Sequence, residues 1–247
     1  MWRKTVAAYR LFLALMHALR GLLIIALIFP RLGDTERQMH VQVWSRQMLR
    51  VLGITLQVQG RTDLSGPLLL VANHISWLDI TALHAARFCR FVAKSDVRAW
   101  PLIGMLAAGV GTLFIQRESR RDAMRVVHHM AEQLQAGDVL AVFPEGTTSD
   151  GRTLLPFHGN LLQAAIAAEA PVQPIALYFL DHEGQMSFAP CYVGDESLMT
   201  SLWRTLTTPG ITVVLNFGEL QTAQGRTRQV WAHDLRETIT RMRASVT

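Results

Sequence analysis

The stretch PLLLVANHISWLDI, residues 67–80, decides the fold expected for this chain. It opens with PLLLVA, six residues without a polar side chain, which is the length and composition of a buried strand. NHIS then supplies a polar turn, and Ser76 and the following WLDI begin a segment, residues 76–87, with helical length and spacing. A strand that leads through a turn into a helix is the unit of an α/β sheet, and open α/β sheets bind their ligands at the carboxyl ends of the strands.

Similar strand and helix segments alternate on either side of this stretch. Short apolar segments suited to buried strands follow at 112–116, 139–143 and 172–179, and helical patterns at 120–135 and 158–169. The pattern begins with ITLQVQG, residues 54–60, and weak period-2 segments near 186–193 and 211–217 could complete the sheet. We therefore predict an α/β domain over residues 54–247, with a mixed, largely parallel sheet flanked by helices.

The first 53 residues have a different pattern. Residues 11–29 are almost wholly apolar and close to the roughly 20 residues that cross a bilayer core, although His17 and Arg20 interrupt them. Pro30 and Gly33 end this helix, and residues 35–52 have the spacing of a second, amphipathic helix. The first helix could cross the bilayer or lie in its plane, and the pair could also pack on the domain's own core. We expect residues 1–53 to form a hydrophobic helical pair that is retained as a membrane anchor, since no small-x-small cleavage site follows the first helix.

Composition narrows the class of partner. Half of the 247 residues are hydrophobic, only 17 % are charged, and the formal net charge is +5 with a pI near 9.9. The surface should attract anions, but the basic residues are scattered without an aromatic-studded nucleic-acid motif. We expect a lipid bilayer as partner and no nucleic acid.

The sequence has no recognisable metal or cofactor motif. Cys89 and Cys191 are too few for a disulfide framework, and they are expected to be small core side chains. His128 and His129 have no carboxylate at a zinc-motif spacing, and no phosphate-binding glycine loop occurs. We expect no bound metal and no bound cofactor.

His74 and Asp79 are the candidate catalytic pair. On a regular helix, residues five apart differ by about 140° in direction, so the two side chains could meet only if His74 lies in the turn. The Asp79 carboxylate could then hold one imidazole nitrogen, leaving the other free to accept a proton. The alternative is that Ser76 and Asp79 form a capping box for the helix, with His74 a structural turn residue. This decapeptide alone leaves both interpretations open.

Three motifs in order supply a resemblance. NHISWLD, GTLFIQR (residues 111–117) and FPEGT (residues 143–147) resemble the glycerolipid acyltransferase family, which includes bacterial lysophosphatidate acyltransferases. The resemblance covers about residues 65–180. It implies that His74 is the general base and Asp79 its orienting acid. It also implies an acceptor site that includes Gly111, Arg117, Glu145, Gly146 and Thr147, with Lys94 either an anion contact or a surface lysine.

The resemblance further implies a reaction. A fatty acyl chain would pass from acyl-CoA or acyl carrier protein to the free hydroxyl of a lysophospholipid, 1-acylglycerol-3-phosphate, to give phosphatidic acid. We expect direct attack without an acyl-enzyme, with backbone amides near residues 75–77 as oxyanion donors. The enzyme would act at the bacterial inner membrane, with its active site on the cytoplasmic side.

Thr148 departs from the family pattern, because phosphatidate-forming members commonly have a basic residue after EGT. The TTSDG sequence, residues 147–151, resembles instead the members that acylate lyso-ornithine lipid. This acceptor is the main alternative within the family. Outside it, a thioesterase-like hydrolase and a non-catalytic lipid-binding protein are the competing classes. Neither the choice of donor nor the length of the acyl chain follows from the sequence.

Overall fold

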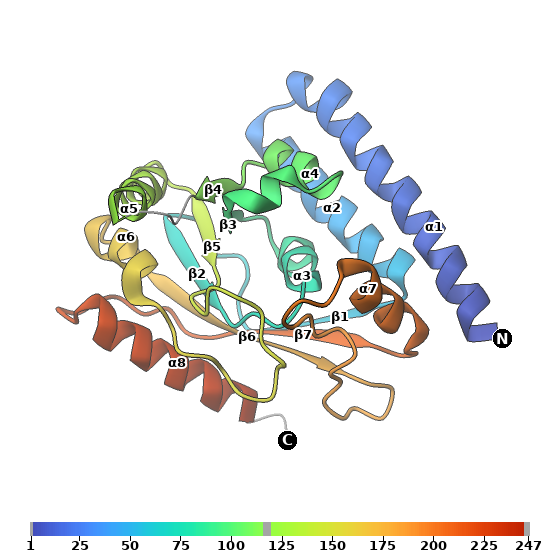
Figure 1. Ribbon diagram of the computed structural model, residues 1–247. Helices are drawn as coiled ribbons and strands as arrows, with labels where there is room; N and C mark the ends of the chain where they lie inside the picture. The colour runs from blue at the N-terminus through green and yellow to red at the C-terminus, as the bar shows by residue number, and fades with distance from the viewer. Residues whose placement is uncertain (1, 116–119, 245–247) are drawn as a thin grey trace.

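The computed structural model describes residues 2–115 and 120–244, and contains one seven-stranded sheet (Figure 1). Its strands are β1 (Thr55–Gln59), β2 (Leu68–Ala72), β3 (Arg90–Lys94), β4 (Leu113–Ile115), β5 (Val139–Val142), β6 (Val172–Leu180) and β7 (Thr212–Phe217). The spatial order is β1-β7-β6-β2-β5-β3-β4. The five strands from β6 to β4 are parallel to one another, whereas β7 is antiparallel to β6 and β1 is parallel to β7. The predicted mixed, largely parallel sheet is confirmed.

Helices cover both faces of this sheet (Figure 1). They are α1 (Trp2–Leu23), α2 (Asp34–Leu52), α3 (Leu78–Ala86), α4 (Ile103–Gly109), α5 (Arg120–Gln135), α6 (Leu162–Ala167), α7 (Leu198–Thr207) and α8 (Arg228–Ala244). One apolar cluster joins the sheet to α1, α2, α3 and α7, and a second joins it to α5, α6 and α8.

The strand β2 explains why its sequence is apolar throughout. Leu68, Leu70 and Ala72 belong to the first cluster, while Leu69 and Val71 belong to the second. All five residues are at most 2 % exposed. Because successive side chains of a strand point to opposite faces, a central strand covered on both sides needs an apolar residue at every position.

Most of the predicted elements are present, with three differences. The segment near 186–193 is not a strand; Met186 makes only an isolated bridge to Leu180. The strand β3 was missed, as were α4, α7 and α8. The predicted helix 158–169 is shorter, consisting of a 3₁₀ turn, Gly159–Leu161, followed by α6.

The two N-terminal helices lie side by side and turn their polar groups toward each other. His17 Nε2 lies 3.0 Å from the carbonyl oxygen of Trp44, whose indole Nε1 donates to the carbonyl oxygen of His17 at 3.1 Å. The two rings stack with centroids 4.9 Å apart. Arg20 likewise donates to Gln47 Oε1 at 3.2 Å. The polar residues that interrupt the first apolar segment are therefore engaged with α2.

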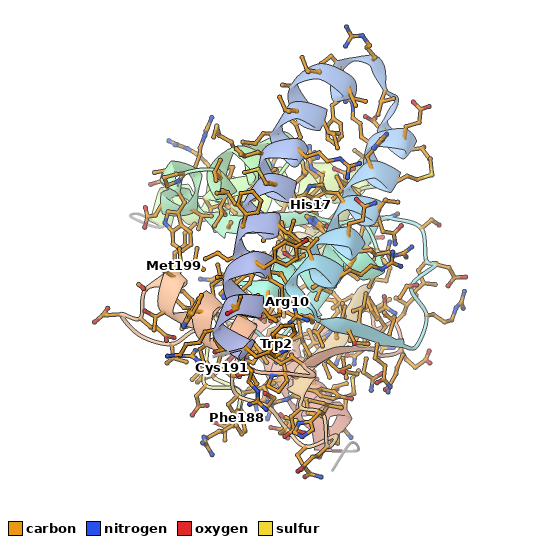
Figure 2. The ribbon with its side chains drawn as sticks, turned by 90° about the vertical axis from the view of Figure 1, so that its right-hand side faces the viewer. Trp2, Arg10, His17, Phe188, Cys191 and Met199 are labelled. Atoms are coloured by element: carbon orange, nitrogen blue, oxygen red, sulfur yellow. The ribbon has the colours of Figure 1, made fainter. Side chains whose placement is uncertain are left out.

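The outward face of α1 is apolar. Its exposed large side chains are Trp2, Tyr9, Phe12, Leu15, Met16, Leu19 and Leu23. Figure 2 looks onto this face, with Trp2 at its N-terminal end and Met199 of α7 beside the helix. By length and composition alone, Trp2–Arg31 is apolar enough to cross a membrane.

The chain changes direction at the carboxyl ends of two neighbouring strands. The strand β2 continues into α3 on one face of the sheet, and β5 leads to α6 on the other face. Because β2 and β5 pair directly, with Val71 opposite Val142, the two connections leave adjacent strands on opposite sides. The carboxyl ends of the strands at such a switch point are where open α/β sheets commonly bind ligands.

Candidate active site

The His74 turn and the Glu145 loop meet at this switch point. His74 follows β2 by two residues and Glu145 follows β5 by three. The backbone N–H of His74 donates to Glu145 Oε1 at 2.7 Å, and the His74 carbonyl oxygen accepts the Ser149 N–H at 2.9 Å. Both backbone polar groups of His74 are therefore bound to the loop that follows β5.

The buried Asp79 carboxylate holds one side of the His74 ring. Asp79 Oδ2 lies 2.8 Å from His74 Nδ1 and accepts the backbone N–H groups of Ile75 and Ser76 at 2.8 and 2.9 Å. Asp79 is fully buried, whereas the His74 side chain is 18 % exposed. A carboxylate partner assigns the proton of the neutral imidazole to Nδ1, which leaves Nε2 as a proton acceptor.

Both interpretations of the Asp79 position hold together. The carboxylate satisfies backbone donors at the start of α3, as a capping residue does, and Ser76 Oγ accepts the Leu78 N–H at 3.2 Å. The same oxygen atom also orients His74. The cap and the histidine contact are one structure, because the capped turn carries the imidazole to the carboxylate.

Phe143 supports the other part of the imidazole. Its ring lies 3.9 Å from the His74 ring, centroid to centroid, with only 7° between the planes. Asn73 fixes the start of the turn, because its side-chain amide exchanges two hydrogen bonds with the backbone of Leu177 in β6. Neither residue was assigned a role from the sequence, although each is the first residue of a motif, Asn73 of NHISWLD and Phe143 of FPEGT.

Glu145 is a buried brace within the protein. It is 4 % exposed, and its second oxygen, Oε2, accepts the Leu155 N–H at 2.9 Å. Burial raises the pKa of the Glu145 carboxyl above its ordinary value, against the opposing effect of the N–H groups donated by His74 and Leu155. Because both oxygens already accept backbone protons, the carboxylate holds the His74 turn and its own loop together.

The other expected acceptor-site residues are only partly brought together. Gly146, with φ of 72°, and the exposed Thr147 follow Glu145 directly, beside His74. Lys94 is exposed at the carboxyl end of β3, on the same sheet edge. Arg117 lies outside the described residues.

The structure does not bring Gly111 to this edge. Gly111 precedes β4, so it lies at the amino end of that strand, and the site residues follow the carboxyl ends of β2 and β5. Its φ of 81° is a structural reason for glycine, and its carbonyl oxygen accepts a hydrogen bond from Arg90 Nε at 2.9 Å. Gly111 therefore lies at the end of the sheet opposite to His74.

Two of the expected oxyanion donors already have a hydrogen-bond partner. The amides of Ile75 and Ser76 both donate to Asp79 Oδ2, so they are not free to bind a developing negative charge. This part of the prediction was wrong for these two residues, since a sequence does not indicate which partner a turn amide takes.

The two cysteines are small buried side chains, as predicted, at 0 % exposed for Cys89 and 6 % for Cys191. Burial raises the pKa of the Cys89 thiol to about 12 and that of Cys191 to about 11. Both thiols are therefore neutral near pH 7, and the thiolate is the nucleophilic form of cysteine.

The chain is similar to known proteins of one family. Residues 54–178 match the family model Acyltransferase. The chain is 40 % identical to a 1-acyl-sn-glycerol-3-phosphate acyltransferase of Neisseria meningitidis, over 70 % of this chain and 68 % of the relative. It is 41 % identical to a lyso-ornithine lipid O-acyltransferase of Pseudomonas aeruginosa, over 69 % of this chain and 65 % of the relative.

A solved structure has the same fold. The crystal structure of the 1-acyl-sn-glycerophosphate acyltransferase PlsC of Thermotoga maritima superposes with a TM-score of 0.72, covering 96 % of this chain and 92 % of that one at 21 % identity. The family match spans the strands β1, β2 and β5 and the turns that carry His74 and Glu145. We conclude that this chain belongs to the acyltransferase family of enzymes.

Proposed function

We propose that the protein transfers a fatty acyl chain from a thioester, acyl-CoA or acyl carrier protein, to the free hydroxyl of 1-acylglycerol-3-phosphate, with His74 as general base oriented by Asp79. The observation that carries this proposal is the 2.8 Å contact between His74 Nδ1 and the fully buried Asp79 carboxylate. It leaves Nε2 of a partly exposed imidazole as a proton acceptor at the sheet edge.

The proposed step uses the two substrates and the side chains of His74 and Asp79. As the lysolipid hydroxyl oxygen attacks the thioester carbonyl carbon, its proton passes to His74 Nε2 and the carbonyl electrons move onto oxygen. Collapse of this tetrahedral intermediate breaks the carbon–sulfur bond, and the leaving thiolate takes the proton from the imidazolium. Asp79 stabilises that imidazolium, as a buried carboxylate does beside a catalytic histidine in other acyl-transfer enzymes. The neutral thiols of Cys89 and Cys191 support direct transfer without an acyl-enzyme.

For the acceptor head group, we propose the loop after Glu145 and the exposed ammonium of Lys94. Gly146 and Thr147 follow Glu145, which binds the His74 backbone, so a head group bound there would place its hydroxyl near the imidazole. A glycine lets backbone N–H groups approach an anion closely, and we assign the arginine of the GTLFIQR motif, Arg117, to the same task on the strength of the family resemblance alone.

Lyso-ornithine lipid is the second candidate acceptor, favoured by one observation. Thr148 occupies the position after EGT, and its hydroxyl donates to the carbonyl oxygen of Tyr192. This position therefore presents a neutral, internally bound side chain to the acceptor. Such a site lacks one cation for a phosphate and suits a head group that carries its own ammonium group.

The acceptor panel separates these possibilities. Purified enzyme in detergent, with a labelled acyl donor, is expected to acylate lysophosphatidate at least about tenfold faster than lyso-ornithine lipid, because head-group contacts discriminate acceptors in the transition state. A higher rate with lyso-ornithine lipid would contradict the first candidate and support the second. Release of free fatty acid in place of acylated lipid would identify a hydrolase, and lipid binding without turnover would identify a non-catalytic lipid-binding protein.

For residues 1–53, we propose in-plane membrane binding, with α1 lying in one leaflet and the active site on the cytoplasmic side. A crossing helix would have to carry α2 with it, because α2 packs along α1, and α2 contains Asp34, Glu36 and several arginines. Charged groups are costly in the bilayer core. In contrast, an in-plane α1 buries its outward apolar stripe and leaves α2 at the polar interface.

Replacing Leu15 and Leu19, which are 44 % and 39 % exposed on α1, with glutamate tests this arrangement. Each substitution is expected to lower binding to vesicles of phosphatidylethanolamine and phosphatidylglycerol by about tenfold, since each removes a leucine that would be buried in the bilayer. Turnover of a short-chain, water-soluble acceptor should be unchanged. Val230→Glu on α8, half-exposed at 50 %, is the matched control. Unchanged vesicle sedimentation of the double variant would refute the in-plane anchor.

A further inference from the structure

The loop between β5 and α6 has no regular secondary structure, so contacts with other elements hold it in place. The described residues 143–158 form no helix or strand, yet they carry Glu145 and Ser149, which bind the backbone of His74. An irregular segment of this length within a compact domain is commonly functional. Its position relative to His74 therefore depends on individual hydrogen bonds.

Two of the contacts that hold this loop come from the last helix, α8, which lies beyond the matched residues 54–178. Arg236 donates to the carbonyl oxygens of Leu154 and Leu155, at 2.8 Å from Nη2 and 3.1 Å from Nε. Arg243 donates from Nη2 to the carbonyl oxygen of Gly151. The two arginines are seven residues apart, which places them on the same face of the helix. Figure 1 shows α8 beneath the sheet, with the yellow segment that follows β5 beside it.

Each arginine is connected to the backbone of His74 by a short series of hydrogen bonds. Arg236 binds the Leu155 carbonyl, the Leu155 N–H donates to Glu145 Oε2 at 2.9 Å, and Glu145 Oε1 accepts the His74 N–H at 2.7 Å. This first connection ends at the His74 N–H group.

The second connection ends at the His74 carbonyl. Arg243 binds the carbonyl oxygen of Gly151, whose N–H donates to Ser149 Oγ at 3.3 Å. Ser149 Oγ and N both donate to the His74 carbonyl oxygen, at 3.3 and 2.9 Å. A Cβ at Gly151 would meet Ile75 Cγ2 at 3.4 Å, so the loop also packs directly on the catalytic turn.

Arg243 is placed as a buried cation among acidic groups. It is only 9 % exposed, and the carboxylates of Glu145 and Asp150 act on it electrostatically. Its Nε has no hydrogen-bond partner among the described residues. A buried guanidinium is costly to desolvate, so a buried arginine with one donor unused points to a task other than core packing.

Resting on the proposed function, we propose that Arg236 and Arg243 of α8 are positioning residues for acyl transfer, which hold the loop of residues 143–158 and through it fix both the N–H group and the carbonyl group of His74. The C-terminal helix is then part of the catalytic apparatus. It sets the distance between the imidazole and the acceptor, because the same loop carries Gly146 and Thr147.

The test replaces each arginine with methionine and with lysine, and combines the two methionine changes. Arg241→Met is the matched control, because Arg241 lies exposed on the same helix and, within residues 2–115 and 120–244, its side chain makes only a 3.5 Å hydrogen bond to Thr238 Oγ1. All variants are assayed in detergent with labelled acyl donor and lysophosphatidate, and their folding is checked by circular dichroism and Tm. Histidine labelled with ¹³C at Cε1 reports the His74 environment by NMR, with its signal assigned by comparison with His74→Gln.

The double methionine variant is expected to fold and to lose about 10²-fold in kcat, the size of effect that a small misplacement of reacting groups produces. Its His74 signal should shift. Arg243→Lys should lose less kcat, and shift the His74 signal less, than Arg243→Met. Arg241→Met should match the wild type within about twofold in kcat. An unshifted His74 signal in the folded double variant would overturn the positioning role, as would wild-type kcat. If the wild type itself acylates no acceptor, the proposed function fails, whereas the NMR signal still decides the positioning role.

Discussion

Replacing His74 with glutamine is expected to lower acyl transfer to lysophosphatidate by about 10²–10⁴-fold, the contribution that a positioned general base makes. Glutamine can occupy the same turn and hydrogen-bond to Asp79, but its amide does not accept a proton at neutral pH. The backbone bonds of residue 74 to Glu145 and Ser149 do not depend on its side chain, so the variant should fold. Initial rates with a labelled donor, at saturating acceptor, measure the loss.

His128→Gln is the matched control for this variant. The His128 side chain is 79 % exposed on α5 and pairs with Glu132 at 3.2 Å, so its loss should leave the rate unchanged. Wild-type turnover by a folded His74→Gln enzyme would show that another group removes the hydroxyl proton.

Replacing Asp79 with asparagine is expected to lower kcat by a similar factor, about 10²–10⁴-fold, while the fold is kept. The asparagine carbonyl oxygen can still accept the N–H groups of Ile75 and Ser76, which Asp79 Oδ2 binds at 2.8 and 2.9 Å. It carries no charge to stabilise the imidazolium, and its NH₂ group would occupy the position of Oδ1, which has no hydrogen-bond partner among the described residues. The expected result is therefore a catalytic defect with the same circular dichroism spectrum.

Asp79→Ala separates the two tasks of this carboxylate. It removes the acceptor for both turn amides, and each unpaired buried donor costs about 1–3 kcal/mol, so the alanine variant should also be less stable. A Tm equal to that of the asparagine variant would contradict the capping role, and wild-type kcat in Asp79→Asn would contradict the orienting role.

The α/β part of the fold could largely be predicted, because buried central strands have distinctive sequences. PLLLVA and VQPIALYF are apolar at nearly every position, since β2 and β6 are covered on both faces. The strand β3 was not predicted, because the charged residues Arg90 and Lys94 at its two ends leave only three apolar residues between them. Residues 186–193 alternate like a strand, but the chain there forms a loop held by Arg204, which donates to the carbonyl oxygen of Ala189 at 2.8 Å.

The contact between His74 and Asp79 was predictable from the sequence, and the contacts that support it were less so. His74 and Asp79 lie in one short motif, whose spacing allows only a turn followed by a helix. The clamp from Arg236 and Arg243 begins about 160 residues later in the chain, so only the folded structure brings it to His74. Its one local signal is a pair of arginines at a spacing of seven on the buried face of α8. Gly111 shows the reverse case, in which a motif residue folds away from the site.

The most direct test of the account is the pairwise coupling of His74 and Asp79 in kcat. Wild type, His74→Gln, Asp79→Asn and the double variant are compared with radiolabelled donor, so that residual transfer can be quantified. If Asp79 acts only by orienting the imidazole and stabilising its protonated form, the double variant should be no slower than His74→Gln alone. If the two losses instead multiply, the residues act independently, and an imidazole held by its neighbouring carboxylate is not how this enzyme activates the acceptor hydroxyl.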